Sequence, residues 1–257
     1  MTLDPALASA VGRLARVPQL LVACDYDGTL APIVEDPSTA APLPEAIDAV
    51  RALAALPCTT VAIVSGRARH DLATLSRLPS EVHLVGSHGS EFDTGFVGGL
   101  PAELVDLRSR LEKAVEEIVG ATPGVRLEPK PASVAVHTRT ATRPDADAIR
   151  QAILNGPASW AGVHVTQGKE VVELLVLATH KGTAIDALRE QLGADAVLFI
   201  GDDVTDENAF AHLRGPDVGI KIGPGTTKAG HRVADPDTAA QVLALLLEAR
   251  RAHLPRS

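Results

Sequence analysis

The sequence predicts an α/β protein with a doubly wound parallel sheet and a small inserted α+β domain. Short apolar segments alternate with amphipathic helical patterns, the aromatic content is only 2%, and the alternation breaks between about residues 100 and 178. Small aliphatic side chains suit helices that pack on a buried parallel sheet. Strand–helix alternation favours right-handed crossovers between parallel strands.

The core elements are expected on both sides of the break. Apolar runs typical of buried strands are Leu20 to Cys24, Thr60 to Val64, Val82 to Val85, Ala196 to Ile200 and Val218 to Ile222. Apolar spacing, often after a Pro, Asp or Thr, predicts helices over Pro44 to Leu56, Arg69 to Leu78, Gly182 to Leu192, Asp206 to Leu213 and Asp237 to His253.

The middle of the chain follows the order helix, two strands, helix, two strands. The expected helices are Ala102 to Val119 and Pro144 to Leu154, and the extended runs are Val125 to Leu127, Val134 to His137, Val163 to Val165 and Val171 to Val176. We therefore expect a core domain of residues 1–99 and 179–257 that is interrupted by an α/β domain of residues 100–178.

Composition limits the classes of partner. The 257 residues carry a formal net charge of −8, which argues against nucleic acid or an anionic membrane surface as the partner. No apolar run approaches the roughly 20 residues of a membrane span, so we expect a cytoplasmic protein. Cys24 and Cys58 have apolar or small neighbours and are expected to be inert thiols in the core.

Chemically reactive side chains directly follow three of the predicted strands. They are Asp25, Asp27, Ser65, Arg67, Asp202 and Asp206, with Gly66 between Ser65 and Arg67 and with Lys181 at the start of a helix. Because ligands bind at the carboxyl ends of the strands in open α/β sheets, we expect these side chains to converge at one edge.

Carboxylates gathered at one edge repel one another unless a cation lies among them. Hard oxygen ligands of this kind select Mg²⁺, which is the expected cofactor. A metal, a lysine, a hydroxyl and helix N-termini around an attacking carboxylate suit phosphoryl transfer through an aspartyl-phosphate.

These motifs, in this order, resemble those of the haloacid-dehalogenase-like phosphatases. The resemblance implies that Asp25 is the nucleophile and Asp27 the general acid and base, and that Ser65 and Lys181 hold the phosphoryl group. It also implies that Mg²⁺ is bound by the Asp25 side chain, the Asp27 carbonyl and Asp202, with Asp206 in support. The inserted domain then resembles the cap of these enzymes.

Further segments, over roughly residues 18 to 235, resemble the trehalose-6-phosphate phosphatases. They are Val64 to Arg67, Gly86 to Glu91, Glu128 to Ser133 with His137, Gly168 to Leu174, and Gly201 to Glu207. The resemblance implies a small sugar phosphate as substrate. The implied sugar-binding residues are Gly66, Arg67, His88, Glu91, Glu128, Lys130, Ser133, Lys169 and Glu173.

One segment departs from the family pattern, because Leu175-Val176-Leu177 follows Glu173 where a basic residue and a proline are expected. A sequence without a glycosyltransferase-sized partner domain predicts a stand-alone phosphatase, expected to be a monomer.

Other interpretations of the motifs remain open at this stage. Sucrose phosphate or a glycosyl phosphoglycerate could be the substrate, although the latter's extra carboxylate demands more cationic groups than Lys130 and Lys169. A phosphosugar-binding regulator without turnover needs neither Asp25 nor Asp27. The polar residues of the cap could also lie on an outer face of its sheet, because side chains alternate along a strand.

Overall fold

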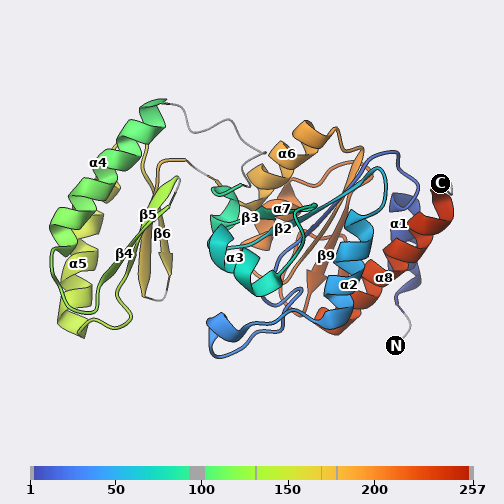
Figure 1. Ribbon diagram of the computed structural model, residues 1–257, viewed down its shortest axis with the longest axis horizontal. Coiled ribbons are helices and arrows are strands. Elements are labelled where there is room, and N and C mark those ends of the chain that lie inside the picture. The colour runs from blue at the N-terminus through green and yellow to red at the C-terminus, as the bar shows by residue number, and fades with distance from the viewer. Residues whose placement is uncertain (1–2, 93–101, 131, 169, 178, 255–257) are drawn as a thin grey trace. The chain divides into compact units, whose positions relative to one another are not determined.

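The computed structural model describes residues 3–92, 102–130, 132–168, 170–177 and 179–254 (Figure 1). The chain forms two compact units, which we call the core unit (Met1–Val97 with Thr179–Ser257) and the inserted unit (Gly98–Ala178). None of the helices within the described ranges is both long enough and apolar enough to cross a bilayer.

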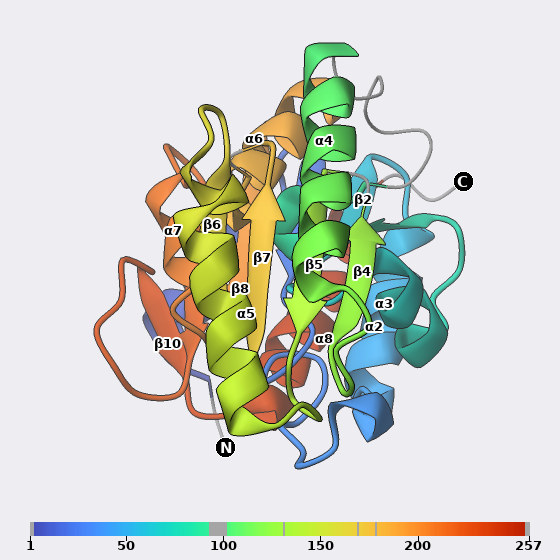
Figure 2. The ribbon, with the colours of Figure 1, turned by 90° about the vertical axis from the view of Figure 1, so that its left-hand side faces the viewer.

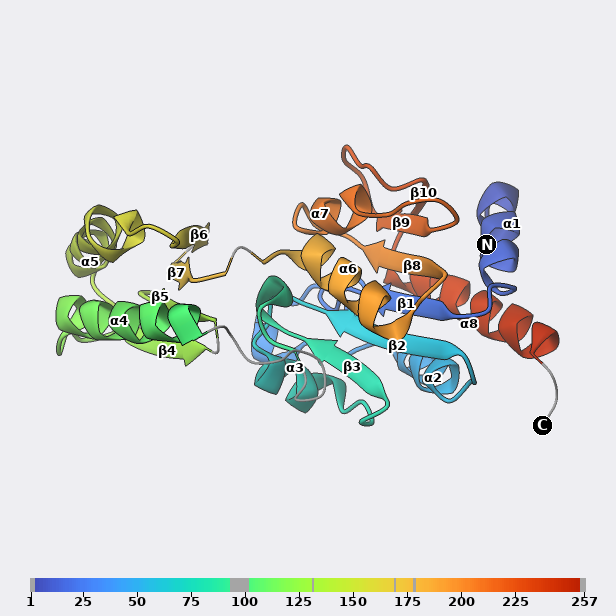
Figure 3. The same cartoon turned by 90° about the horizontal axis from the view of Figure 1, so that it is seen from above.

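The core unit is built on a six-stranded parallel sheet with the strand order β10-β9-β8-β1-β2-β3 (Figure 3). The strands are β1 (Leu20–Cys24), β2 (Thr59–Val64), β3 (Val82–Val85), β8 (Ala196–Gly201), β9 (Val218–Ile222) and β10 (His231–Val233). The first five confirm the strands expected from apolar runs, whereas β10 was not predicted. It has only three residues, and a periodic pattern needs more.

Helices pack on both faces of this sheet. They are α1 (Pro5–Leu14), α2 (Pro44–Ala54), α3 (Arg69–Ser76), α6 (Lys181–Leu192), α7 (Asp206–Ala211) and α8 (Pro236–His253), with the 3₁₀ turns η1 (Pro37–Thr39) and η2 (Ser87–Gly89). Along β1, Leu20, Val22 and Cys24 pack in the cluster that contains α1, α2 and α8. Leu21 and Ala23 face the opposite cluster, formed with α6 and α7. Both faces of the strand are therefore buried, as its continuous apolar run predicts.

Some predictions of local structure were wrong. Helix α1 was not expected, although Asp4 caps it and Pro5 occupies its first turn. Helix α3 ends at Ser76, two residues early, because Arg77 adopts a left-handed conformation with φ 48°. Cys24 is buried as expected, but Cys58 is exposed and also has a positive φ, of 54°. It lies in the turn before β2 rather than in the core.

The inserted unit is a four-stranded antiparallel sheet with the order β4-β5-β7-β6. Its elements are α4 (Ala102–Val119), β4 (Arg126–Lys130), β5 (Ser133–His137), α5 (Arg143–Asn155), η3 (Pro157–Ser159), β6 (His164–Gly168) and β7 (Val171–Leu175). Figure 2 shows α4 and α5 lying across one face of this sheet. The predicted order of helices and strands is confirmed.

Candidate active site

The carboxyl ends of the central strands β1, β2 and β8 bring the sequence motifs together. Because Cys24 pairs with both Ile63 and Ile200, the residues that follow the strands emerge at the same edge of the sheet. They surround a cavity of about 570 Å³. Its lining comprises Asp25, Asp27, Ile33, Val34, Pro37, Ser65, Gly66, Arg67, His88, Lys181, Asp202, Asp203 and Thr205.

Lys181 forms the centre of a buried ion-pair network. Its Nζ lies 2.8 Å from Oδ1 of Asp25 and 2.7 Å from Oδ1 of Asp206. Burial raises the pKa of Asp25 to about 7, and the charge of Asp206 adds to this effect against the opposing attraction of Lys181. Burial also disfavours the charged form of Lys181, but the two carboxylates outweigh it and raise its pKa.

Asp206 holds the loop after β8 in place. Its Oδ2 accepts hydrogen bonds from the backbone N–H groups of Asp202 and Asp203, at 2.9 and 2.8 Å. A Cβ atom at Gly201 would lie 2.3 Å from Cγ of Asp206, so only glycine fits there. Both oxygens of Asp206 therefore have partners within the protein, which supports a positioning role.

Asp25, Asp202 and Asp206 form a group whose carboxylate oxygens lie within 4.8 Å of one another. Burial raises the pKa of Asp202 to about 6, and the neighbouring Asp206 adds to this. Three carboxylates against the two buried ammonium groups of Lys181 and Lys221 leave uncompensated negative charge in a largely desolvated volume. The donor set therefore fits a hard divalent cation held by oxygen ligands.

Asp27 is engaged by Arg67 in a bidentate ion pair. The guanidinium Nε and Nη2 donate to the two carboxylate oxygens of Asp27, each at 2.6 Å. The guanidinium also lies over the ring of Tyr26, 5.6 Å from its centroid. Both carboxylate oxygens of Asp27 therefore accept from a single guanidinium, which fixes the orientation of the carboxylate.

The segment Ser65-Gly66-Arg67, which follows β2, packs tightly against the loop after β3. Ser65 is buried and its Oγ accepts a hydrogen bond from the backbone N–H of Arg67 at 3.1 Å. The backbone N–H of His88 donates to the carbonyl of Ser65 at 2.9 Å. A Cβ atom at Gly66 would lie 2.6 Å from the His88 ring, so the glycine lets this ring reach the cavity wall.

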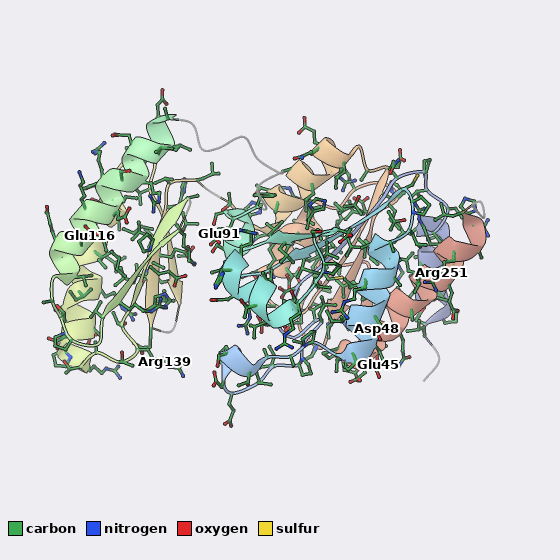
Figure 4. The ribbon with its side chains drawn as sticks, viewed as in Figure 1. Glu45, Asp48, Glu91, Glu116, Arg139 and Arg251 are labelled. Atoms are coloured by element: carbon green, nitrogen blue, oxygen red, sulfur yellow. The ribbon has the colours of Figure 1, made fainter. Side chains whose placement is uncertain are left out.

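Glu91 lies beyond the end of β3, and both of its carboxylate oxygens accept hydrogen bonds from nearby residues of the core unit (Figure 4). One carboxylate oxygen accepts from the Oγ of Ser87 and the other from the backbone N–H of Arg69 at 3.0 Å. Glu91 does not belong to the described residues that line the cavity. Its contacts hold the loop that carries His88.

The inserted unit brings three of its predicted residues together. Oε1 of Glu173 accepts hydrogen bonds from Oγ of Ser133 at 2.6 Å and from Nζ of Lys130 at 3.2 Å. These side chains alternate with Val134 and Leu174, which pack in the apolar cluster of α4 and α5. The polar group therefore lies on the face of the sheet opposite these helices.

Glu128 lies on the same face, since strand alternation separates it from Leu127, which packs against the apolar cluster. Its Oε2 lies 2.7 Å from Nε2 of His137. Burial alone would raise the pKa of Glu128, but the hydrogen bond with His137 and the neighbouring cations lower it below its ordinary value. Lys169 lies outside the residues that the structure describes.

Two further residues of the site were not predicted. Lys221 is buried in β9 and its ammonium donates to the backbone carbonyl of Asp202. Thr29 donates to Oδ1 of Asp202 at 3.4 Å. The signal for Lys221 was available, because a single charge in the apolar run Val218 to Ile222 needs a partner when it is buried.

A parallel sheet of this kind, with its acidic cluster at the carboxyl edge, places the protein in the class of haloacid-dehalogenase-like hydrolases. The narrower assignment comes from comparison with known proteins. The chain belongs to the trehalose-phosphatase family, whose model matches residues 23–240, and the members of this family are phosphoric monoester hydrolases.

Individual relatives agree with this assignment. A bifunctional trehalose-6-phosphate synthase/phosphatase from Thermoproteus tenax is 36% identical over 86% of this chain, which spans only 31% of that relative. A trehalose 6-phosphate phosphatase from Zea mays is 30% identical over 98% of this chain and 75% of its own length.

The fold has close counterparts among solved structures. The trehalose-6-phosphate phosphatase of Aspergillus fumigatus matches with a TM-score of 0.64 at 24% identity, over 96% of this chain and 98% of that one. At this level of identity, the comparison supports the fold alone.

Proposed function

We propose that this protein hydrolyses trehalose 6-phosphate to trehalose and phosphate through an aspartyl-phosphate on Asp25. The observation that carries the proposal is the buried Asp25–Lys181–Asp206 ion-pair network at the end of β1, with Asp27 two residues further along the chain. Family membership supports the reaction class, and the names of the relatives support the substrate.

In the first step, a carboxylate oxygen of Asp25 attacks the phosphorus atom. The bond between phosphorus and the sugar oxygen breaks, its electron pair stays with the sugar oxygen, and Asp27 donates a proton to that oxygen. Lys181 and Ser65 bind oxygens of the transferring group. Arg67, which donates to both carboxylate oxygens of Asp27 in the structure, orients this carboxyl group.

In the second step, the ionised Asp27 takes a proton from water. The water oxygen attacks the phosphorus atom, the acyl–phosphate bond breaks, and the carboxylate of Asp25 is restored with release of phosphate. Asp27 acts here as a carboxylate, and its two oxygens lie within hydrogen-bond distance of Arg67.

The side chains of Asp25 and Asp202 and the backbone carbonyl of Asp27 would hold Mg²⁺, with Asp206 orienting the loop. When bound, the cation would supply charge neutralisation for the phosphoryl oxygens. Recognition of the sugar hydroxyls is assigned to the cap-like inserted unit, through Glu128, Lys130, Ser133, Lys169 and Glu173. Gly66, Arg67 and His88 contribute from the core unit, and Glu91 acts by holding the His88 loop.

The test is phosphate release from a panel that contains trehalose 6-phosphate, sucrose 6-phosphate, a glycosyl phosphoglycerate and 4-nitrophenyl phosphate, with Mg²⁺ or with EDTA. We expect the highest kcat/KM for trehalose 6-phosphate and loss of activity in EDTA. Asp25→Asn should be inactive, while Asp48→Asn, whose carboxylate is 79% exposed, serves as the matched control. A higher kcat/KM for either of the other sugar phosphates would overturn the substrate assignment.

A further inference from the structure

A polar cluster outside the cavity joins α6 to α7, the two helices that begin with Lys181 and Asp206. It consists of His180, Asp186 and His212. Nδ1 of His212 lies 2.5 Å from Oδ2 of Asp186, and the rings of the two histidines meet edge to face with their centroids 5.0 Å apart. Among the described residues that line the cavity, none belongs to this cluster.

His180 caps the helix that carries Lys181. Its Nδ1 accepts a hydrogen bond from the backbone N–H of Thr183 at 3.2 Å, and its own backbone N–H donates to Oγ1 of Thr183 at 3.1 Å. This reciprocal pair is a capping box. The cap requires a lone pair on Nδ1 and therefore a neutral ring. Burial and the neighbouring His212 lower the pKa of His180, which also favours the neutral ring.

Gly182 brings the two helices into very close contact. A Cβ atom there would lie 2.4 Å from the carbonyl oxygen of Asn208 and 2.5 Å from Cδ2 of His212. The His212 ring therefore lies directly against the first turn of α6. The bond from His212 to Asp186 lies one turn further along α6 and fixes the ring in this position.

We propose that His212 is a positioning residue that acts through Lys181. By bonding Asp186 and packing on Gly182, it fixes α7 against the first turn of α6. The ammonium of Lys181 is thereby held between Asp25, which follows β1, and Asp206, which begins α7. The inference rests on the proposed function, because that function places Lys181 in the reaction.

A small displacement of α7 would matter because the ammonium has short contacts with both carboxylates, at 2.8 and 2.7 Å. Misplacement of a catalytic group by about 1 Å can cost about 10² in rate. A partial shift of the helix therefore predicts a loss of roughly five- to fiftyfold in kcat.

The kinetic test compares three substitutions of His212. The amide nitrogen of His212→Asn can replace Nδ1 as the donor to Asp186, whereas His212→Gln places its amide nearer to Nε2, and His212→Ala removes the donor. For both trehalose 6-phosphate and 4-nitrophenyl phosphate, kcat should fall at least about fivefold in the Ala and Gln variants and less than about twofold in the Asn variant. KM for trehalose 6-phosphate should change less than about twofold, because the proposed sugar contacts are elsewhere.

His253→Ala, at an exposed histidine near the end of α8, is the matched control and should be unchanged. A His212→Ala enzyme with kcat within about twofold of the unaltered protein would overturn the proposal. So would equal losses in the Asn and Ala variants, because a role in packing alone does not depend on the donor to Asp186.

A stability measurement decides the inference independently of turnover. Asp25→Asn removes the charge opposite Lys181, so the resulting shift in melting temperature should depend on where the ammonium lies. We expect the change in melting temperature caused by Asp25→Asn, measured in EDTA at about pH 8, to depend on residue 212. It should differ by at least about 3 °C between the protein that retains His212 and the protein that carries His212→Ala. If Asp25→Asn changes the melting temperature by the same amount in both proteins, the positioning role of His212 is overturned. Absence of phosphate release from the unaltered protein would instead refute the proposed function.

Discussion

Replacing Asp25 by Asn should abolish turnover and at the same time stabilise the divalent-free protein above neutral pH. The Asp25 side chain is almost completely buried, and burial raises its pKa from 3.8 to about 7. The native state therefore binds a proton more tightly than the unfolded state does. Above about pH 4 the unfolded state gains stability by ionising, so the contribution of Asp25 to folding becomes less favourable as the pH rises towards about 7.

The magnitude follows from the two pKa values. One pKa unit is equivalent to about 1.4 kcal/mol, so a change from 3.8 to about 7 sets an upper limit of about 4 kcal/mol on the cost of ionised Asp25. Asn is nearly isosteric and uncharged, and Lys181 keeps Asp206 as its partner at 2.7 Å. We expect Asp25→Asn to raise the free energy of unfolding by on the order of 2–4 kcal/mol above about pH 7.

The assay is thermal unfolding in EDTA at a series of pH values from about 4 to about 9. For a chain of this length, about 2–4 kcal/mol corresponds to a rise of roughly 5 to 15 °C in melting temperature at about pH 8, with little difference near the acidic end of the series. Mg²⁺ should reduce the difference, because it stabilises the unaltered protein by binding its native state. Asp48→Asn should show no such pH dependence. A variant that is no more stable than its parent at the alkaline end, or equally stabilised at both ends, would refute the reasoning.

Further predictions concern four other positions. Asp27→Asn should lower single-turnover phosphorylation by roughly 10²–10⁴ for the sugar phosphate and by much less for 4-nitrophenyl phosphate, whose leaving group needs no proton; equal losses in stopped-flow measurements would count against the acid role. Glu173→Gln should cost about 1.5–3 kcal/mol in kcat/KM for trehalose 6-phosphate and little for the aryl phosphate, and a parallel loss would mean that the residue supports the fold instead. Gly28→Ala should raise the Mg²⁺ concentration needed for half-maximal activity, because Gly28 has φ 77° and a Cβ atom at this position would lie 2.1 Å from Oδ2 of Asp202. An unchanged curve of activity against Mg²⁺ concentration would contradict this prediction. Arg250→Met should lower the free energy of unfolding in denaturant by at least about 1–3 kcal/mol, because its buried guanidinium donates to several backbone carbonyls that would lose their donor. A loss under about 1 kcal/mol would contradict it.

Matched substitutions separate these effects from general damage. Glu116→Gln, on the exposed side of α4 (Figure 4), is the control for Glu173→Gln and should leave both kcat/KM values unchanged. Arg251→Met, at the exposed neighbour of Arg250 (Figure 4), should change the free energy of unfolding by less than about 0.5 kcal/mol.

The sequence alone determined the order of the core strands along the chain and the edge at which the reactive residues meet. Both depend on local information. A run of apolar residues such as Leu20 to Cys24 specifies a strand buried on both faces, and the residues just beyond it must emerge at its carboxyl end. The convergence of Asp25, Ser65 and Asp202 then follows from the parallel sheet, without knowledge of any side-chain contact.

Only the tertiary structure decided which partners these residues have. The bidentate pair of Arg67 with Asp27 and the bonds of Glu173 with Lys130 and Ser133 join residues 40 or more positions apart, and no local pattern specifies them. The tertiary structure also decided the role of Glu91, whose carboxylate accepts from the backbone N–H of Arg69, 22 positions earlier, and does not belong to the described residues that line the cavity. The physical reason is that a carboxylate or guanidinium can satisfy its hydrogen bonds with many different groups, and the packing of distant segments selects the partner from among them.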